Sequence, residues 1–284
     1  MNKILVPLNL SSDYQHLLNY ALSFAQKSRA EVTFIYVGSR WTVSQEKTTF
    51  VLDAQDALET YELITNGKLR QRLAYIADLF LSQDLSYTVK MARGTWLGEL
   101  TQETKEHVYD LVLVGTSIQR GVAKYISNAW ISRLIGTVKA PVFLLPPKSP
   151  FNEIGHITYA VDLTDYDPGV VKQVKSIASL FDAKLTIAHV NIQEQASEAH
   201  EHYVTMLDQT ISDTLDYPKV HYRFFDHKDP LSGIKKLVNI NDSQILAMTN
   251  RKRFSWKELF SSQSLTRKMA KDLSVPVLAF RKQK

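Results

Sequence analysis

Short apolar runs alternate with amphipathic segments along the chain. Ile4–Leu8 is an apolar run typical of a buried strand, in which Pro7 is tolerated near the start of the strand or at a sheet edge. A polar turn follows, and apolar residues then recur at helical spacing over positions 17–25. Glu31–Val37 is the next apolar run, so the first 37 residues predict a βαβ unit. Tyr87–Ala92 predicts a third strand.

The same pattern recurs 153 residues later without a gap. Ile157–Val161 and Lys184–Val190 repeat the first two predicted strands, and Ala183 aligns with Ala30. Val220–Phe225 is the matching third strand. The chain is therefore expected to be a tandem duplication.

One stretch organises each half. Asp110–Pro147 and Ser243–Lys282 both contain an apolar run, a polar loop, an amphipathic helix and an x-Pro step that opens a last apolar run. The first of these runs are Leu111–Val114 and Ile245–Met248. Because an open α/β sheet binds its ligand outside the carboxyl ends of its strands, the loops after these two runs are the first candidates for a ligand site.

The element order in each half predicts the fold class. Five strands alternating with helices, joined by right-handed crossovers, give a doubly wound five-stranded parallel sheet. The inserts Lys47–Ser82 and Ser197–Leu215 are expected to be mostly helical. The predicted domains are residues 1–147 and 154–284, joined by the stiff connector Pro146–Pro150.

Composition and charge exclude some kinds of site but do not select one function. The chain is 44% hydrophobic and 22% charged, and it contains no cysteine, which excludes disulfides and thiolate sites. No apolar segment is long enough for a signal peptide or a membrane span, so a soluble cytoplasmic protein is expected. From Arg251 onward, ten cations face two acids. This end is either a solvated helix face, the simpler interpretation, or a surface for nucleic acid or another anionic partner.

Both halves resemble the universal stress protein family. The resemblance lies in the opening ILVPLN, the strand EVTFIYV, the region of Gly94 after the third strand, the run LVLVGT and the segment APVFLL, and it is weaker but collinear in the second half. It implies the strand order 3-2-1-4-5. It also implies pairing of the fifth strands, Val142–Leu145 with Val277–Phe280, as an intrachain pseudo-dimer, with further homodimerisation allowed.

ATP-binding members of this family carry G-x2-G-x9-G-[ST] after the fourth strand and an acid at the end of the first. In such a loop, backbone N–H groups and a helix N-terminus surround the phosphates. The first half keeps Gly115, but Ile118, Asn128 and Ala129 occupy the later positions, and Asn9 replaces the acid. Asn128 can still adopt a left-handed backbone.

The second half restores the acid as Asp162. Its loop is then read as Met248, Arg251, Gln263 and Ser264, so no glycine remains. The family-derived nucleotide positions of the two halves also include the ends of the second strands. The full candidate set is Asn9, Val37, Gly94, Gly115, Asn128, Asp162, Val190, Arg251 and Ser264.

The missing glycines and hydroxyl determine the nucleotide affinity that we expect. A micromolar site needs about −8 kcal/mol, and each lost charge-assisted phosphate hydrogen bond removes roughly 1.5–3 kcal/mol. The sequence therefore predicts no cofactor and a non-catalytic stress-response protein that acts as a binding or regulatory module through unknown protein partners. The alternative is an ATP- or AMP-binding protein, with the ligand in the second domain and weak ATPase activity. There Arg251, Lys252 and Arg253 would hold ATP, phosphate or another small anion.

No catalytic or metal site is predicted. His200 and His202 are two residues apart and point to different sides of a helix, which favours a solvated helix over a metal site. His227, in the loop after the third strand of the second half, could act as an acid or base or be part of a polar loop. Ser, His and Asp residues show no spacing that supports a triad.

Overall fold

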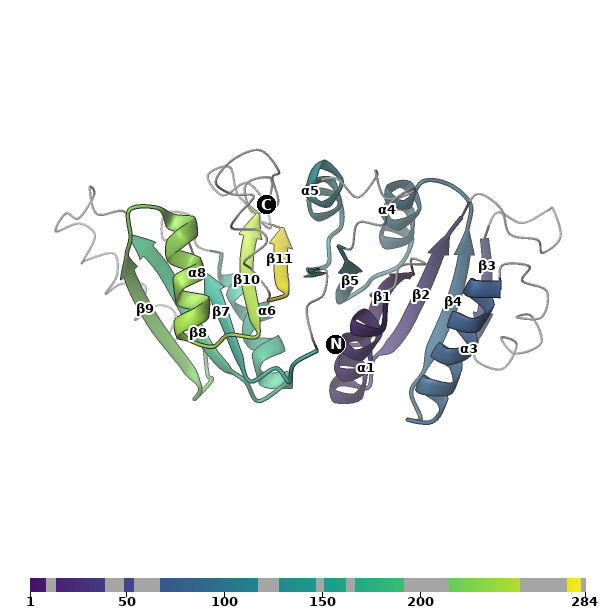
Figure 1. The fold of residues 1–284 in the computed structure, drawn as a ribbon, viewed down its shortest axis with the longest axis horizontal. Helices are drawn as coiled ribbons and strands as arrows, with labels where there is room; N and C mark the ends of the chain where they lie inside the picture. The colour runs from purple at the N-terminus through teal and green to yellow at the C-terminus, as the bar shows by residue number, and fades with distance from the viewer. Residues whose placement is uncertain are drawn as a thin grey trace. The chain divides into compact units, whose positions relative to one another are not determined.

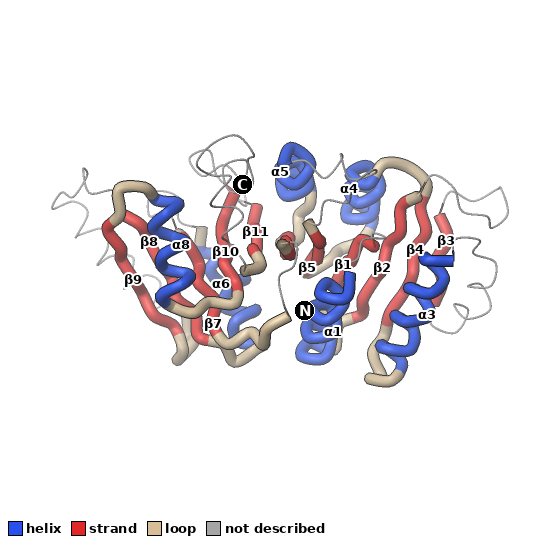
Figure 2. Tube along the Cα trace, in the orientation of Figure 1, coloured by secondary structure: helices blue, strands red, loops and turns tan. Residues whose placement is uncertain are grey.

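The computed structural model of the chain describes residues 1–8, 14–38, 49–53, 67–116, 128–146, 151–161, 167–191, 215–250 and 275–281. The chain divides into two compact units, Met1–Phe151 and Asn152–Lys284. Each unit consists of a mostly parallel sheet with helices packed on its faces (Figures 1 and 2).

The first unit is built on a sheet whose described strands follow the order β3-β4-β2-β1-β5-β6. All neighbours are parallel except β3, which is antiparallel to β4. The strands are β1 (Lys3–Leu8), β2 (Glu31–Val37), β3 (Thr49–Asp53), β4 (Tyr87–Ala92), β5 (Leu111–Gly115) and β6 (Val142–Leu145).

Helices cover the first sheet on both faces. In Figure 1, α1 (Tyr14–Ser28) and α3 (Gly67–Leu81) lie on one face. Right-handed crossovers place α4 (Trp96–Glu106) and α5 (Asn128–Thr137) on the other, where the two helices pack together. Because both faces are covered, the central strands are apolar throughout, and every residue of β1 from Ile4 to Leu8 is buried.

Pro7 lies near the end of a central strand, neither at a strand start nor at a sheet edge as the sequence predicts. The register explains how it is tolerated. Strand β1 pairs with β2 along its whole length, but with β5 only at Ile4 and Leu5. Pro7 has no N–H to donate, and it lies beyond the ladder with β5, where no donor on that side is needed.

The second unit repeats this arrangement. Its described strands follow the order β9-β8-β7-β10-β11, and all are parallel. Helices α6 (Pro168–Leu180) and α8 (Pro230–Ile240) lie on opposite faces of the sheet (Figure 1). The strands are β7 (His156–Ala160), β8 (Lys184–Asn191), β9 (Val220–Asp226), β10 (Ile245–Asn250) and β11 (Val277–Arg281).

The repeat extends to register and backbone conformation. Lys3 pairs with Glu31 in the first unit, and His156 pairs with Lys184, each 153 residues later, in the second. Arg29 and Asp182, also 153 residues apart, both adopt positive φ, at 56° and 54°, just before the second strand of their units. The fold class predicted from the sequence, two tandem doubly wound domains with the order 3-2-1-4-5, is confirmed.

The insert Lys47–Ser82 contains the helix α3, in line with the prediction, and also a strand, β3, that the sequence analysis does not predict. Residues 49–52, Thr-Phe-Val-Leu, have the β-branched and aromatic composition of a strand. By pairing antiparallel with β4, this strand covers the edge of the first sheet and adds a sixth strand to the five predicted. The other insert, Ser197–Leu215, lies outside the described residues except for Leu215.

Within the described part of the chain, no helix is both long and apolar enough to cross a bilayer. The pairing of the fifth strands of the two units stays a prediction.

Candidate functional site

The carboxyl ends of the strands form the edge where a doubly wound sheet takes a ligand. In the first unit the strand order reverses between β1 and β5, because the chain continues from β1 to β2 on one side and from β5 to β6 on the other. This is the topological switch point, the usual ligand position in such a sheet. Among the predicted site residues, the structure brings Val37, Gly94 and Gly115 to this edge. Asn9, directly after β1, lies outside the described residues.

Val37 closes the end of β2. Its side chain is buried, and in register it pairs with Ala92, the last residue of β4. The N–H of Gly38 donates to the carbonyl of Ala92 at 3.1 Å, which extends the pairing by one residue. Tyr36 precedes Val37 and packs its ring against Gly38, and burial raises the pKa of its hydroxyl. The end of β2 is therefore a tightly packed apolar rim.

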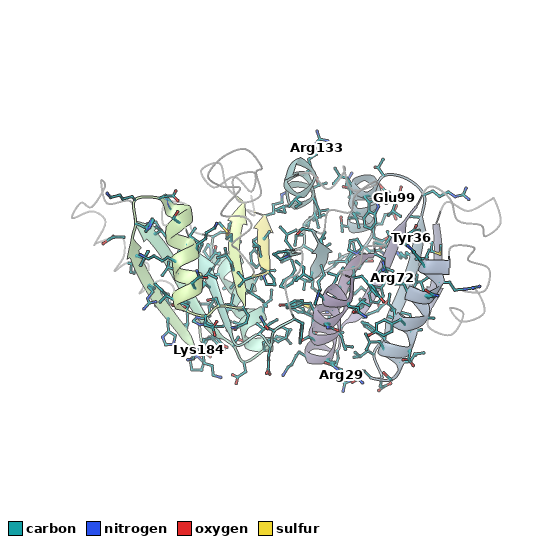
Figure 3. All side chains as sticks on the ribbon, viewed as in Figure 1. Arg29, Tyr36, Arg72, Glu99, Arg133 and Lys184 are labelled. Atoms are coloured by element: carbon teal, nitrogen blue, oxygen red, sulfur yellow. The ribbon has the colours of Figure 1, made fainter. Side chains whose placement is uncertain are left out.

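Gly94 is a position that only glycine fits. Its φ is 153°, a backbone conformation that L side chains rarely adopt. A β-carbon there would overlap the carboxylate of Glu99, which lies against the Gly94 backbone. Thr95 caps α4 by accepting a hydrogen bond from the N–H of Gly98 at 3.2 Å. Glu99 follows in the first turn of α4, where Figure 3 labels it.

Glu99 places an acid at the rim that the sequence does not identify as a site residue. Burial raises the pKa of its carboxyl, and the charge of Glu106 raises it further. The signal in the sequence is the capping segment that runs from Thr95 to Glu99, which favours a carboxylate in the first turn of a helix. A carboxylate against Gly94 disfavours an approaching anion, because like charges repel.

Gly115 ends β5 at the switch point. Among the described residues, a β-carbon at this position would come near only the side chain of Leu17, at 3.9 Å, which is ordinary van der Waals contact. The described packing therefore does not require glycine here. The next residue, Thr116, is buried, and it ties the end of β5 to β6, because its N–H and its hydroxyl both donate to the carbonyl of Leu145, at 2.8 and 2.9 Å. Asn128 is the first residue of α5, and its side chain is outside the described part of the structure.

Strand register changes the alignment of the second unit. Ile4 pairs with Leu111 in the first unit, and its counterpart Ile157 pairs with Ile245 in the second. Counting along β5 and β10 from these pairs, Gly115 corresponds to Thr249. The fifth strands agree, because Gly115 pairs with Leu145 and Thr249 pairs with Phe280.

The assignment of Met248 to the first glycine position is therefore wrong by one residue. A short apolar run alone does not define where a strand ends, whereas pairing with both neighbours does. The position three residues on then becomes Lys252 and not Arg251. Both residues lie outside the described part of the chain, as do Asp162 and Ser264.

The side chain of Thr249 lies in the protein interior. It is buried, and its hydroxyl lies 3.0 Å from the hydroxyl of Tyr159 on the central strand β7. The first-unit counterpart of Tyr159 is Val6, so this hydroxyl pair belongs to the second unit alone. A glycine that could let phosphate approach the backbone is thus replaced by a side chain held in a buried hydrogen bond.

Val190 also packs inward. It is buried near the end of β8, and a β-carbon on Gly233 of α8 would lie 2.6 Å from its Cγ1. The absence of a side chain at Gly233 lets the start of α8 lie directly on Val190. Asp229 caps this helix by accepting from the N–H of Ser232 at 2.8 Å. Val190 is therefore a contact between a helix and the sheet.

His227 belongs to its own loop. Its Nδ1 lies 3.1 Å from the N–H of Asp229 and 2.7 Å from the Asp229 carbonyl, and its ring stacks on Phe225 at 6.1 Å between centroids. This geometry favours the polar-loop interpretation of His227. Within the described ranges, no group of three or more His, Asp or Glu residues is placed to hold a metal ion.

A buried polar cluster, also missed by sequence reasoning, lies under α4. Glu103 is buried and forms an ion pair with Lys90 at 2.7 Å, and it accepts a hydrogen bond from the hydroxyl of Tyr109. Burial raises the pKa of Tyr109 well above its ordinary value, and the hydrogen bond to Glu103 raises it further. A lone lysine in β4 and a glutamate 13 residues later give no pattern in the sequence that would predict their contact.

Comparison with known proteins was made for sequence and for structure. The model of the Universal stress protein family matches residues 1–146. No curated protein matches the sequence.

Several solved structures share the fold over nearly the whole chain. A universal stress protein from Archaeoglobus fulgidus DSM 4304 superimposes with a TM-score of 0.67 at 16% identity, over 100% of this chain and 97% of that one. A functionally unknown protein from Pseudomonas aeruginosa PAO1 gives 0.62 at 16% identity, over 99% and 92%. The cytoplasmic domain of a prokaryotic cation chloride cotransporter gives 0.58 at 9% identity, over 98% and 94%.

Proposed function

Because the chain belongs to the universal stress protein family, we propose that it is a non-catalytic binding or regulatory module that does not hold ATP tightly. The observation that carries this proposal is Thr249. This residue stands at the first position of the phosphate loop in the second unit, where its buried side chain bonds to Tyr159. A phosphate loop works by exposing backbone N–H groups at glycine positions, and this position instead carries a side chain held in the protein interior.

The first unit supports the same conclusion with different residues. Gly115 is kept, but Ile118 replaces the second glycine and Ala129 replaces the hydroxyl. Glu99 adds a carboxylate at the rim, on the Gly94 backbone. Each missing phosphate contact costs roughly 1.5–3 kcal/mol, and two or three of them turn a micromolar Kd into a millimolar one or weaker.

In this proposal the protein acts through its surfaces on protein partners. The supporting observation is that the described residues at these edges make ordinary contacts within the fold, with Val37 in register with Ala92 and Val190 against Gly233, while the fold is retained in both units. A scaffold that is retained after its nucleotide positions have changed is expected of a protein that functions by association.

Calorimetric titration with ATP and with AMP tests the proposal, using the full chain with Lys184→Glu so that a second, surface site for phosphate does not contribute heat. We expect no saturable heat below about 1 mM ligand, which corresponds to a binding free energy weaker than about −4 kcal/mol. A Kd in the micromolar range would overturn the proposal. In that case the variants Asp162→Ala, Arg251→Ala and Ser264→Ala locate the ligand. Loss of binding in all three would establish the alternative, a nucleotide site in the second domain.

A further inference from the structure

A group of basic residues lies on the α8 face of the second sheet. We call His156, Lys184, His221 and Arg223 the basic face. The first three lie at the amino-terminal ends of their strands, and Arg223 lies in the middle of β9. They share a face with Thr158 and Thr186, because His156 pairs with Lys184, Thr186 pairs with His221, and residues two apart on a strand point to the same side. Asn241, which caps the end of α8, donates to Thr158 at 3.2 Å and accepts from Arg223 at 2.8 Å. Figure 3 labels Lys184 at the start of β8.

One of the four residues contacts a hydroxyl on this face, and the others are placed near it by the strand register. The Nε2 of His156 lies 2.7 Å from the hydroxyl of Thr186. In register, His156 pairs with Lys184, and His221 pairs with Thr186. Arg223 is two residues beyond His221 on the same face, and its bond to Asn241 fixes its orientation. Lysine, arginine and imidazole side chains from three strands therefore lie on one face.

The equivalent face of the first unit has balanced charge. Lys3, Glu31 and Lys90 occupy the positions of His156, Lys184 and Arg223. Lys3 pairs with Glu31 at 3.5 Å. Lys90 pairs at 2.7 Å with Glu103, which comes from the helix above. Each cation of that face thus has its own carboxylate.

The second unit keeps cations on this face and loses both acids. Lys184 replaces Glu31, which reverses a charge. Glu103 is the eighth residue after the N-cap of α4, and the eighth after the N-cap of α8 is Leu237, which is fully buried. Among the residues that the structure describes, no carboxylate forms an ion pair with Lys184, His221 or Arg223.

The pKa of His156 reflects the charged groups that lie around it. Burial lowers the pKa of His156, and a backbone hydrogen bond with Asn241 raises it. Lys184 and His221 lower the pKa further, while Asp242, at the end of α8, raises it. The nearby Lys219 forms its own ion pair with Asp182, at 2.6 Å, and is not counted in the basic face. The cations therefore repel one another, and an anion would relieve the repulsion.

We propose that the basic face binds a small anion that carries a phosphate group. Phosphate matches the exposed donors, because an arginine fork and a lysine ammonium both bond its oxygens, and its second negative charge suits two permanent cations. The site is independent of the proposed function. His156, Lys184 and His221 lie at the amino-terminal ends of the strands, and Arg223 bonds to Asn241 at the end of α8, whereas the nucleotide edge of this fold lies at the carboxyl ends of the strands.

Nuclear magnetic resonance of the histidine rings tests this site. Inorganic phosphate is titrated into the full chain at constant ionic strength, so that general screening does not change. We expect saturable shifts of the His156 and His221 resonances, identified by the variants His156→Gln and His221→Gln. We also expect the pKa of both rings to rise when phosphate is bound. A parallel titration with glycerol 3-phosphate shows whether free phosphate or a phosphomonoester is preferred.

Matched charge reversals separate a site from general attraction. Lys184→Glu restores the acid that the first unit has at this position, and it should weaken phosphate binding by about tenfold or more. Lys172→Glu makes the same charge change at an exposed position of α6, on the opposite face of the sheet, and should change binding by less than about twofold. Equal effects of the two variants would overturn the proposal. The proposal would also be overturned if the His156 and His221 resonances did not move. Lys172 and Lys184 are both exposed, so both variants are expected to fold.

Discussion

Single residues at the carboxyl ends of the strands determine what this scaffold can bind. Gly94 and Gly115 illustrate two reasons for a glycine in such a fold. Gly94 is favoured by its own backbone conformation, and a β-carbon there would also displace the carboxylate of Glu99. Gly115 is not required by packing, since its nearest neighbour would lie at an ordinary contact distance. Sequence reasoning treats both residues as ligand contacts, and the structure explains Gly94 without a ligand.

The substitutions Gly94→Ala and Gly115→Ala distinguish these reasons. We expect Gly94→Ala to lower the free energy of unfolding by about 1–3 kcal/mol, because alanine is strained at this φ and displaces Glu99. Gly115→Ala should change it by less than about 1 kcal/mol. Chemical denaturation of the two variants and the parent chain measures the difference. Equal losses in the two variants would contradict this explanation of Gly94.

Tyr109 provides a test by pH. Its folded-state pKa is raised by burial and by Glu103, so the folded protein holds this proton more tightly than the unfolded chain does. The associated stability is complete below the unfolded pKa of about 10 and is lost as the pH rises through that value towards the folded pKa. Above pH 10 the loss is about 1.4 kcal/mol per pH unit.

Tyr109→Phe removes this ionisation. Its free energy of unfolding should therefore fall less steeply than that of the parent chain above about pH 10. Denaturation at several alkaline pH values compares the two slopes. The other tyrosines are present in both proteins, so parallel slopes would contradict the burial of the Tyr109 hydroxyl against Glu103.

At the scale of elements, most of the fold can be predicted from apolar runs. Parallel strands covered on both faces are apolar at nearly every position, so β1, β2, β4 and β5 follow directly from the sequence. The strand β3 is missed because it is short and lies inside a long insert, where only its pairing with β4 identifies it. The ends of buried strands are equally hard to predict, which is why the loop of the second unit is aligned one residue too early, at Met248.

Helix capping is an element-scale feature that can be measured directly. Asp167 caps α6 by accepting hydrogen bonds from the N–H groups of Gly169 and Val170, at 2.9 and 3.4 Å. Asp167→Ala should cost about 1 kcal/mol of stability, whereas Asp167→Asn retains an acceptor and should cost only a few tenths. Thermal unfolding of both variants measures the difference, and an alanine variant as stable as the asparagine variant would argue against this cap.

For the whole molecule, duplication has kept the scaffold while the side chains of the two copies have diverged. The register and the left-handed residues Arg29 and Asp182 coincide in the two units. The polar groups on equivalent faces differ, with the ion pair of Lys90 and Glu103 in one unit and Arg223 bound to Asn241 in the other. The nucleotide positions have diverged in the same way, with Gly115 in one unit and Thr249 in the other. The sequence identifies such positions, but contacts between distant residues decide whether each one is filled.

Unfolding of the full chain with and without about 1 mM ATP tests the central claim, that the family fold is retained without a tight nucleotide site. The measurement is made on the Lys184→Glu variant, so that the basic face does not contribute. Our account predicts an increase in stability of less than about 0.4 kcal/mol, the value for a Kd of about 1 mM. An increase of about 2.7 kcal/mol or more, which requires a Kd a hundredfold below the ligand concentration, would contradict it.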